Sequence, residues 1–207
     1  MISRTRVPLN TARRSRAAAL VLTMVAGVAL AGCGKKTPPD PYVGNMSDTS
    51  YAGLVSPGRA VRRLSASGGQ VAMTEFRGRF VWADYAAPWC GPCVQQAKVI
   101  KGLESSFPDV VFLTVMTGKS TNYEDVPDRG TAQGWARRFG LRGDRVVVAT
   151  NLWSRTIPTH ILFSPEGHAL YRWTGGMPAE RISDVLKTRM AEWKRWSKTG
   201  EKAGWMK

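Results

Sequence analysis

Two cysteines three positions apart are the residues of this chain whose types and spacing best fit a chemical reaction. They lie in Trp89-Cys90-Gly91-Pro92-Cys93, which we expect at the start of a helix. This spacing brings two sulfur atoms within disulfide range, and a helix N-terminus favours a thiolate over a thiol. The thiolate is the nucleophile of disulfide exchange. Because Cys90 lies at the exposed end of the predicted helix, we expect it to attack, and Cys93, one turn further in, to resolve the mixed disulfide.

The elements that must position this pair follow from the apolar pattern. Short apolar runs at 80–86 and 110–116 predict two buried strands. Between them, apolar residues at three- and four-residue spacing predict a helix that ends before Pro108. Further along, the pattern predicts a short helix at 131–140, a strand at 146–148, a hairpin of 160–163 with 169–173, and a closing helix from about Pro178. This order predicts an α/β domain with a central sheet and helices on both faces.

Three further features lie at characteristic distances in the sequence from the cysteine pair. Asp84 comes six residues before Cys90 in a predicted buried strand, Thr156-Ile157-Pro158-Thr159 precedes another strand, and Gly175-Gly176 separates the hairpin from the last helix. Together with the Cys-Gly-Pro-Cys segment they resemble the thioredoxin superfamily over residues 70–193. The stretch 73–79, which leads into the first core strand, is similar to that of membrane-tethered TlpA-type reductases. The resemblance implies a thioredoxin fold with a central mixed sheet.

The resemblance also implies roles for the residues that match. Cys90 would be the nucleophile and Cys93 the resolving thiol, and the two would form the redox disulfide. Asp84 would accept or relay the proton of Cys93, since burial disfavours a charged carboxylate and lets such a group act as a base near neutral pH. Asp84 as an ordinary strand-end carboxylate is the alternative.

Three more residues would contact the substrate of such a protein. Pro158 would be cis and face the dithiol, the backbone of Ile157 would pair with the substrate, and Trp89 would shield the site. His160 and His168 fit hairpin residues better than ligands. We expect no metal and no cofactor, because no second cysteine pair completes a zinc site.

The sequence departs from the thioredoxin pattern at two places near the site. Val94 follows the second cysteine where many thioredoxins carry lysine, and the strand 110–116 contains no lysine. We therefore expect Asp84 to lack the ammonium neighbour of thioredoxin itself. The stretch 117–155 is also longer than in minimal thioredoxins.

The N-terminus has the pattern of an export signal. An arginine-rich start is followed by an apolar run of about 15 residues, shorter than the roughly 20 that span a bilayer. The run ends in Leu30-Ala31-Gly32-Cys33, which resembles the lipobox of bacterial lipoproteins. The resemblance implies cleavage before Cys33 and lipidation of its sulfur. An uncleaved anchor helix is the alternative, and both leave the domain exported and tethered to a membrane.

These patterns divide the chain into four segments. We expect a signal peptide at 1–32, the lipidated cysteine with a proline-stiffened tether at 33–59, a thioredoxin-like domain at 60–197, and a basic tail at 198–207. The location would be the cell envelope, facing the periplasm in a Gram-negative host, where Gly34 favours the outer membrane.

The chain is strongly basic, with 30 lysines and arginines against 15 acidic residues and a net charge of +15. Export argues against nucleic acid as a partner, so the charge points to anionic lipid, to an acidic protein, or to a solvated surface. Trp193, Trp196 and Trp205 alternate with lysines near the C-terminus and fit either a membrane interface or packing of the last helix.

The dipeptide between the cysteines indicates the direction of the reaction. Gly91-Pro92 is the dipeptide of reducing thioredoxins, which predicts a reductase of protein disulfides or oxidised cysteines, including those of apocytochrome c. A reductase in an oxidising compartment needs an electron source, and the family implies a membrane donor of the DsbD or CcdA type. The alternatives are a disulfide oxidase or isomerase, and a copper chaperone, which would need a wider cysteine gap and a distal histidine.

Overall fold

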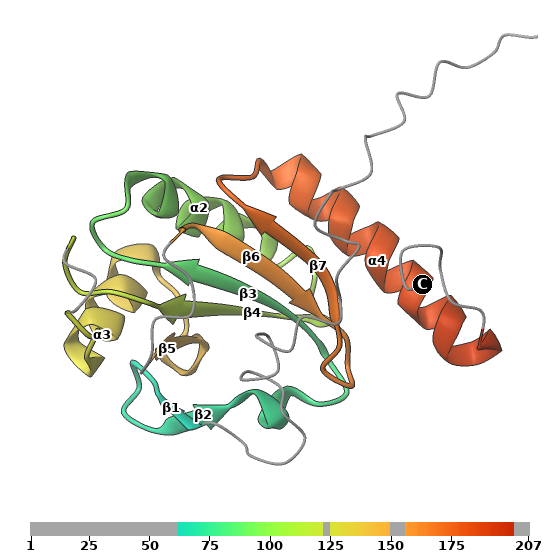
Figure 1. The fold of residues 1–207 in the computed structure, drawn as a ribbon, viewed down its shortest axis with the longest axis horizontal. Helices are drawn as coiled ribbons and strands as arrows, with labels where there is room; N and C mark the ends of the chain where they lie inside the picture. The colour runs from blue at the N-terminus through green and yellow to red at the C-terminus, as the bar shows by residue number, and fades with distance from the viewer. Residues whose placement is uncertain (1–61, 122–124, 150–155, 201–207) are drawn as a thin grey trace, which may run out of the picture. The chain divides into compact units, whose positions relative to one another are not determined.

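The computed structural model describes residues 62–121, 125–149 and 156–200. The expected signal peptide, Cys33, the tether and the end of the basic tail lie outside the described residues. Figure 1 shows the fold. In chain order, its elements are β1 (Arg62–Leu64), β2 (Gln70–Ala72), the 3-10 helix η2 (Met73–Phe76), β3 (Phe80–Ala86), α2 (Gly91–Leu103), β4 (Val110–Met116), α3 (Arg129–Phe139), the 3-10 turn η3 (Gly143–Arg145), β5 (Val146–Val148), β6 (Thr159–Phe163), β7 (Ala169–Thr174) and α4 (Ala179–Thr199).

A five-stranded mixed sheet forms the centre of the domain, in the order β5-β4-β3-β6-β7. β3 pairs in parallel with β4, and β4 with β5, whereas β6 runs antiparallel to both β3 and β7. Every residue of β3 and β4 is buried, which explains why both strands are apolar without alternation. The predicted α/β class and central mixed sheet are confirmed, and this arrangement is the thioredoxin fold.

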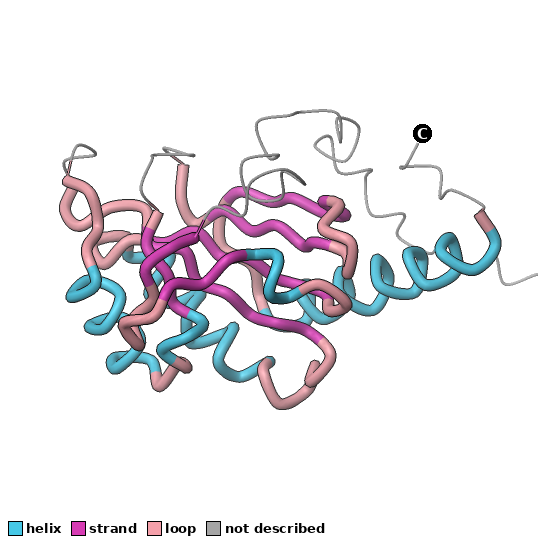
Figure 2. Tube along the Cα trace, turned by 90° about the horizontal axis from the view of Figure 1, so that it is seen from below, coloured by secondary structure: helices cyan, strands magenta, loops and turns pink. Residues whose placement is uncertain are grey.

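Helices lie on both faces of the sheet, as expected, with the described α-helices on one face and the 3-10 helix η2 on the other. On one face, Trp82 and Phe112 pack with residues of α2 and α4, and next to them Met116 and Val146 pack with α3. Figure 2 shows the longer helices gathered on one side of the strands. The chain moves from β3 to β4 to β5 in one direction along the sheet. Because crossovers between parallel strands are right-handed, α2 and α3 must lie on the same face.

The opposite face of the sheet has a different cover. Residues of β3, β4 and β6 on that face pack against Phe76 of η2, with Val71 of β2 and Met73 at the start of η2 nearby. In the part of the chain that the structure describes, the β1–β2 hairpin and η2 therefore cover this face. No apolar period marks such short elements, so the sequence did not predict them.

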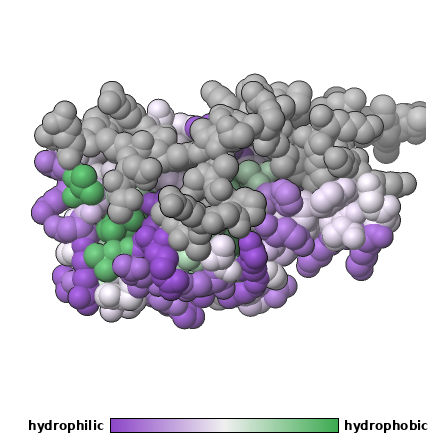
Figure 3. Space-filling model, turned by 60° about the horizontal axis from the view of Figure 1, so that its bottom comes forward, coloured by the Kyte–Doolittle hydropathy of each residue, from purple (hydrophilic) through white to green (hydrophobic). Residues whose placement is uncertain are grey.

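The closing helix α4 is longer than expected. It begins after Pro178 and runs to Thr199, where Gly200 ends it in the left-handed region at φ 73°. Ile182, Leu186 and Trp193 are its buried residues, which accounts for Trp193 by packing. No helix among the described residues is long and apolar enough to span a membrane. In Figure 3 the described surface on the visible side is mostly hydrophilic.

Candidate active site

The two cysteines lie at the start of α2, just after the short connection from β3. β3 ends at Ala86, whose carbonyl oxygen accepts hydrogen bonds from the N–H and from Oγ1 of Thr117, at 2.9 and 3.2 Å. The N–H of Cys90 then donates to the carbonyl oxygen of Ala87 at 3.1 Å. These bonds fix the turn between strand and helix, so the sheet sets the position of Cys90.

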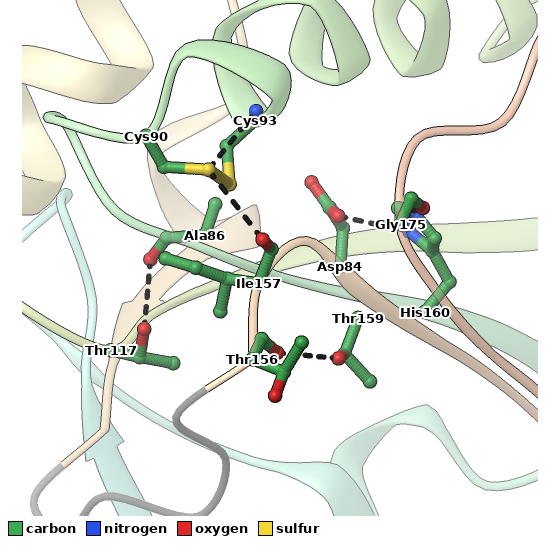
Figure 4. Close-up of a disulfide and its surroundings, with 10 residues drawn as sticks. All are labelled: Asp84, Ala86, Cys90, Cys93, Thr117, Thr156, Ile157, Thr159, His160 and Gly175. Carbon is green, nitrogen blue, oxygen red and sulfur yellow. Dashed lines mark hydrogen bonds and ion pairs between the residues drawn. A yellow bond between two sulfur atoms is a disulfide. The ribbon is translucent and has the colours of Figure 1, made fainter.

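Cys90 and Cys93 form a disulfide whose Cα atoms are 5.2 Å apart (Figure 4). Cys90 is the N-cap of α2, and its Sγ accepts a hydrogen bond from the N–H of Cys93 at 3.3 Å. Cys90 is 5% exposed and Cys93 is fully buried. The helix N-terminus, with its N–H groups and partial positive charge, would stabilise negative charge on Cys90 Sγ in the reduced protein. Of the two cysteines, Cys90 would therefore be the one whose thiolate attacks a substrate disulfide.

The segment before β6 approaches the disulfide from the other side. The Ile157–Pro158 peptide bond is cis, as expected, and Pro158 is buried. The carbonyl oxygen of Ile157 lies 3.8 Å from Cys90 Sγ. The Pro158 carbonyl oxygen accepts a hydrogen bond from the N–H of Gly175 at 2.8 Å, and Thr159 Oγ1 donates to the Thr156 carbonyl oxygen at 2.7 Å. The segment is therefore held at both ends beside the sulfur atoms.

Trp89 completes the immediate surroundings of the pair. It is half-buried and packs against the cluster of residues that contains both cysteines. A Cβ atom at Gly118 would lie 3.5 Å from Trp89 Nε1, so the loop after β4 passes close to the indole. Trp89 thus packs against the cluster of residues that surrounds the two cysteines.

Asp84 lies deeper, on the face of the sheet that α2 covers. Its side chain is 1% exposed, and Oδ1 lies 3.0 Å from Nδ1 of His160, whose side chain is fully buried. In Figure 4 the Asp84 carboxyl group lies between the disulfide and the His160 ring. Asp84 and His160 are register partners on β3 and β6, so their side chains must share a face.

His160 is the residue near the site that sequence reasoning missed, because a histidine in a hairpin carries no motif. We expected Asp84 to lack the ammonium neighbour that thioredoxin has. In this structure the neighbour of the carboxyl group is the imidazole of His160, on β6. The available signal was the spacing of His160, two residues after Pro158 in a strand expected to pair with the strand of Asp84.

Tyr85 is a titratable group next to Asp84 in the sequence, but it does not belong to the site around the disulfide. It follows Asp84 in β3 and therefore points to the opposite face of the sheet, where it is 1% exposed. Burial raises the pKa of Tyr85, although the charge of Arg63 acts in the opposite sense. Tyr85 therefore stays neutral, and among the described residues the buried titratable groups on the disulfide side of the sheet include the cysteines, Asp84 and His160.

The fold and this site define a thioredoxin-like domain with a Cys-x-x-Cys disulfide. Among the described residues, no three or more His, Cys, Asp and Glu side chains are grouped to hold a metal ion. No protein-family model matches the chain, and no curated protein sequence matches it.

Solved structures share the fold at low sequence identity. A secreted disulfide oxidoreductase of Mycobacterium tuberculosis, homologous to Escherichia coli DsbE, superposes with a TM-score of 0.52 at 16% identity, covering 62% of this chain and 96% of that one. The exposed lipoprotein thioredoxin Etrx1 of Streptococcus pneumoniae gives 0.51 at 19%, covering 63% and 99%. A secreted thiol-disulfide isomerase of Corynebacterium glutamicum gives 0.51 at 16%, covering 65% and 85%. The described domain thus matches nearly the whole of these proteins.

Proposed function

We propose that this protein is a thiol–disulfide oxidoreductase that reduces disulfides of other proteins outside the cytoplasm. The observation that carries the proposal is the Cys90–Cys93 disulfide at the N-terminus of α2, with the Ile157 carbonyl oxygen 3.8 Å from Cys90 Sγ. A buried resolving cysteine beside a slightly exposed nucleophile suits a two-step exchange. The similar solved structures are those of a disulfide oxidoreductase, a thioredoxin and a thiol-disulfide isomerase, which supports this class of reaction.

The reaction follows from the geometry. In the reduced protein, the Cys90 thiolate attacks one sulfur of a substrate disulfide, and the first substrate sulfur leaves as a thiolate. Cys93 then loses its proton and attacks Cys90 Sγ, which releases the second substrate sulfur and forms the Cys90–Cys93 disulfide. Two electrons pass to the substrate, which gains two protons from the thiols and solvent. Ile157 would align the substrate backbone, and Trp89 would limit access to the sulfurs.

The direction of the reaction rests on Gly91-Pro92, the dipeptide of reducing thioredoxins. The reduction potential of the active-site disulfide is about −270 mV in thioredoxin and about −120 mV in strong oxidants of the same superfamily. We expect electrons from a membrane donor of the DsbD or CcdA type, and substrates that include the haem-site cysteines of apocytochrome c. The second candidate function is that of a disulfide oxidase or isomerase. It is supported by the likeness of the fold to a secreted thiol-disulfide isomerase.

The first test is the reduction of insulin disulfides by residues 60–207 with dithiothreitol as electron source. We expect turnover by the wild-type domain and none by Cys90→Ser. Equilibration with glutathione or dithiothreitol then gives the potential of the Cys90–Cys93 pair. A value near that of thioredoxin supports a reductase, whereas a value near the oxidant end contradicts that direction and supports the oxidase or isomerase.

The proposed location has a separate test. We propose that Cys33 is lipidated after cleavage of residues 1–32 and tethers the domain to a membrane of the cell envelope. The full-length chain should therefore partition with bacterial membranes, and Cys33→Ala should abolish labelling by a radioactive fatty acid. Labelling that persists in Cys33→Ala contradicts the lipidation of this residue.

A further inference from the structure

A buried pair of titratable side chains lies beneath the disulfide. Asp84 Oδ1 is 3.0 Å from His160 Nδ1, and both side chains are almost completely removed from solvent. On the other side of the ring, His160 Nε2 is 3.2 Å from the carbonyl oxygen of Gly175. Among the described residues, the buried Oδ2 of Asp84 has no hydrogen-bond partner, and the contact of Oδ1 with His160 Nδ1 is close without having the geometry of a hydrogen bond. Each oxygen of the carboxyl group thus has a different environment.

The partners of the ring fix its hydrogen positions. A carbonyl oxygen only accepts, so Nε2 of His160 must carry a hydrogen and donate it to Gly175. A carboxylate oxygen facing a bare ring nitrogen at 3.0 Å would oppose two lone pairs in a dry core. One further proton therefore belongs to the pair, on Oδ1 or on Nδ1. Whichever atom holds it, the Asp84–His160 pair as a whole carries no net charge.

Among the described residues, the side chains that pack on the pair are uncharged. Trp82 stacks on the His160 ring with centroids 5.6 Å apart. The residues that the surrounding elements place on this side are Trp82 from β3, Thr114 from β4, Cys93 and Gln96 from α2, Trp173 from β7 and Ile182 from α4. The charged side chain of Arg181 lies over the Trp173 ring at 3.8 Å. Cys93 is thus the buried titratable group that α2 places over the pair.

We propose that His160 is a positioning residue for the resolving step, acting through Asp84 as the second half of a proton acceptor for the Cys93 thiol. The inference rests on the proposed function and deepens it. Cys93 is fully buried, so its thiol proton needs an acceptor inside the protein. Figure 4 shows the Asp84 carboxyl group on the path from the disulfide to His160. An unpaired Asp84 would be either a costly bare charge or a neutral acid with little basicity.

The proton balance of the step is simple. The Cys93 S–H proton passes to Asp84 Oδ2, and the proton that the pair already holds, on Oδ1 or on Nδ1, comes to rest on Nδ1. The pair gains one positive charge as Cys93 becomes a thiolate, so the total charge of the buried site is unchanged. The thiolate then attacks Cys90 Sγ of the mixed disulfide, and the departing substrate thiolate takes up a proton from solvent. The proton on Oδ2 leaves in turn and restores the neutral pair.

Two asparagine variants separate the halves of the pair. His160→Asn removes the ring base, and Asp84→Asn removes the acceptor. The other histidine of the chain, His168, is exposed, so His168→Asn is the matched control. Each variant of residues 60–207 is mixed in its reduced form with a chromogenic aromatic disulfide. The first release of coloured thiol reports attack by Cys90, and the second reports resolution by Cys93. Near-ultraviolet circular dichroism verifies that each variant is folded.

We expect His160→Asn to leave the attack within about twofold of wild type and to slow resolution at pH 7 by about ten- to hundredfold, the range of a lost general base. The loss should shrink as pH rises, because hydroxide then removes the Cys93 proton. In the Asp84→Asn background, His160→Asn should add no further loss, since His160 acts through Asp84. The nitrogen-15 signals of the His160 ring should shift in Asp84→Asn, while those of His168 stay in place.

Three results would overturn the inference. Resolution by His160→Asn at the wild-type rate overturns it while leaving the proposed function intact. An equal slowing of attack and resolution, or a further loss on top of Asp84→Asn, assigns His160 a merely structural role. A wild-type domain that neither attacks nor resolves the disulfide contradicts the proposed function itself, and the inference falls with it.

Discussion

The Sγ atom of Cys90 accepts a hydrogen bond from the backbone N–H of Cys93 at 3.3 Å, so the proposed nucleophile is also the N-cap of its own helix. The residue at this position therefore has two roles that substitution can separate. A serine hydroxyl is a strong N-cap but a poor nucleophile for disulfides, whereas alanine offers neither group.

We predict that Cys90→Ser and Cys90→Ala both lose insulin reduction completely, but that they differ in stability. The serine variant should exceed the alanine variant by about 0.5–1 kcal/mol in free energy of unfolding, because its hydroxyl still caps α2. Urea titration of both variants, neither of which can form the disulfide, measures the difference. Equal stabilities would show that the contact at Cys90 does not cap the helix.

Gly175 connects two parts of the site and has a backbone that other residues rarely adopt. Its φ is 107°, its N–H donates to the Pro158 carbonyl oxygen, and its own carbonyl oxygen accepts from His160. We predict that Gly175→Ala lowers the free energy of unfolding by about 1–2 kcal/mol, since a Cβ atom disfavours this conformation. Gly176→Ala is the control and should cost less than about 0.5 kcal/mol. Denaturant unfolding compares the two, and equal losses would remove the conformational explanation.

Gln96 ties α2 to the segment before α4. Its buried Oε1 accepts a hydrogen bond from the N–H of Met177 at 2.7 Å. We predict that Gln96→Leu destabilises the fold by about 1–3 kcal/mol, because it leaves a buried N–H without an acceptor. The neighbouring Gln95 is exposed, and Gln95→Leu should change stability by less than about 0.5 kcal/mol. A Gln96→Leu protein that unfolds at the wild-type urea midpoint would contradict this prediction.

The N-terminus of α3 makes the stability of the fold depend on pH. The hydrogen bond from Lys119 holds the pKa of the Asp128 carboxyl well below its usual range, and Asp128 also caps α3 through the Thr131 N–H. A carboxyl group whose pKa is lowered by folding stabilises the fold above its unfolded pKa of about 4, and this contribution is lost as pH falls through the folded value.

We therefore predict that Asp128→Asn, which keeps a capping side chain, melts below wild type at pH 7 and that the gap narrows as the pH falls below about 4. High salt should narrow it too, because the pair with Lys119 is exposed. Thermal unfolding at several pH values measures the gap. A gap that stays constant from pH 7 to pH 2 would show that the charge of Asp128 is not its source.

The long periodic elements of this fold were predictable because burial on both faces leaves a direct trace in the sequence. The strand predictions at 80–86 and 110–116 coincide with β3 and β4, and the helix before Pro108 corresponds to α2. That the described helices α2 and α3 share one face depends instead on the direction of two crossovers, which no local pattern carries. The β1–β2 hairpin and η2 are too short to show an apolar period.

The sequence by itself determined the chemistry of the protein: two cysteines at a spacing that suits a redox disulfide, a helix start beneath them, and a proline segment and a buried acid at fixed intervals. These features are local, so residue type and spacing express them. Only the tertiary structure decided that His160 stands 3.0 Å from Asp84, with Gly175 on its far side. The register between β3 and β6 sets that contact, because the two residues are 76 positions apart in the chain and only strand pairing brings their side chains onto one face.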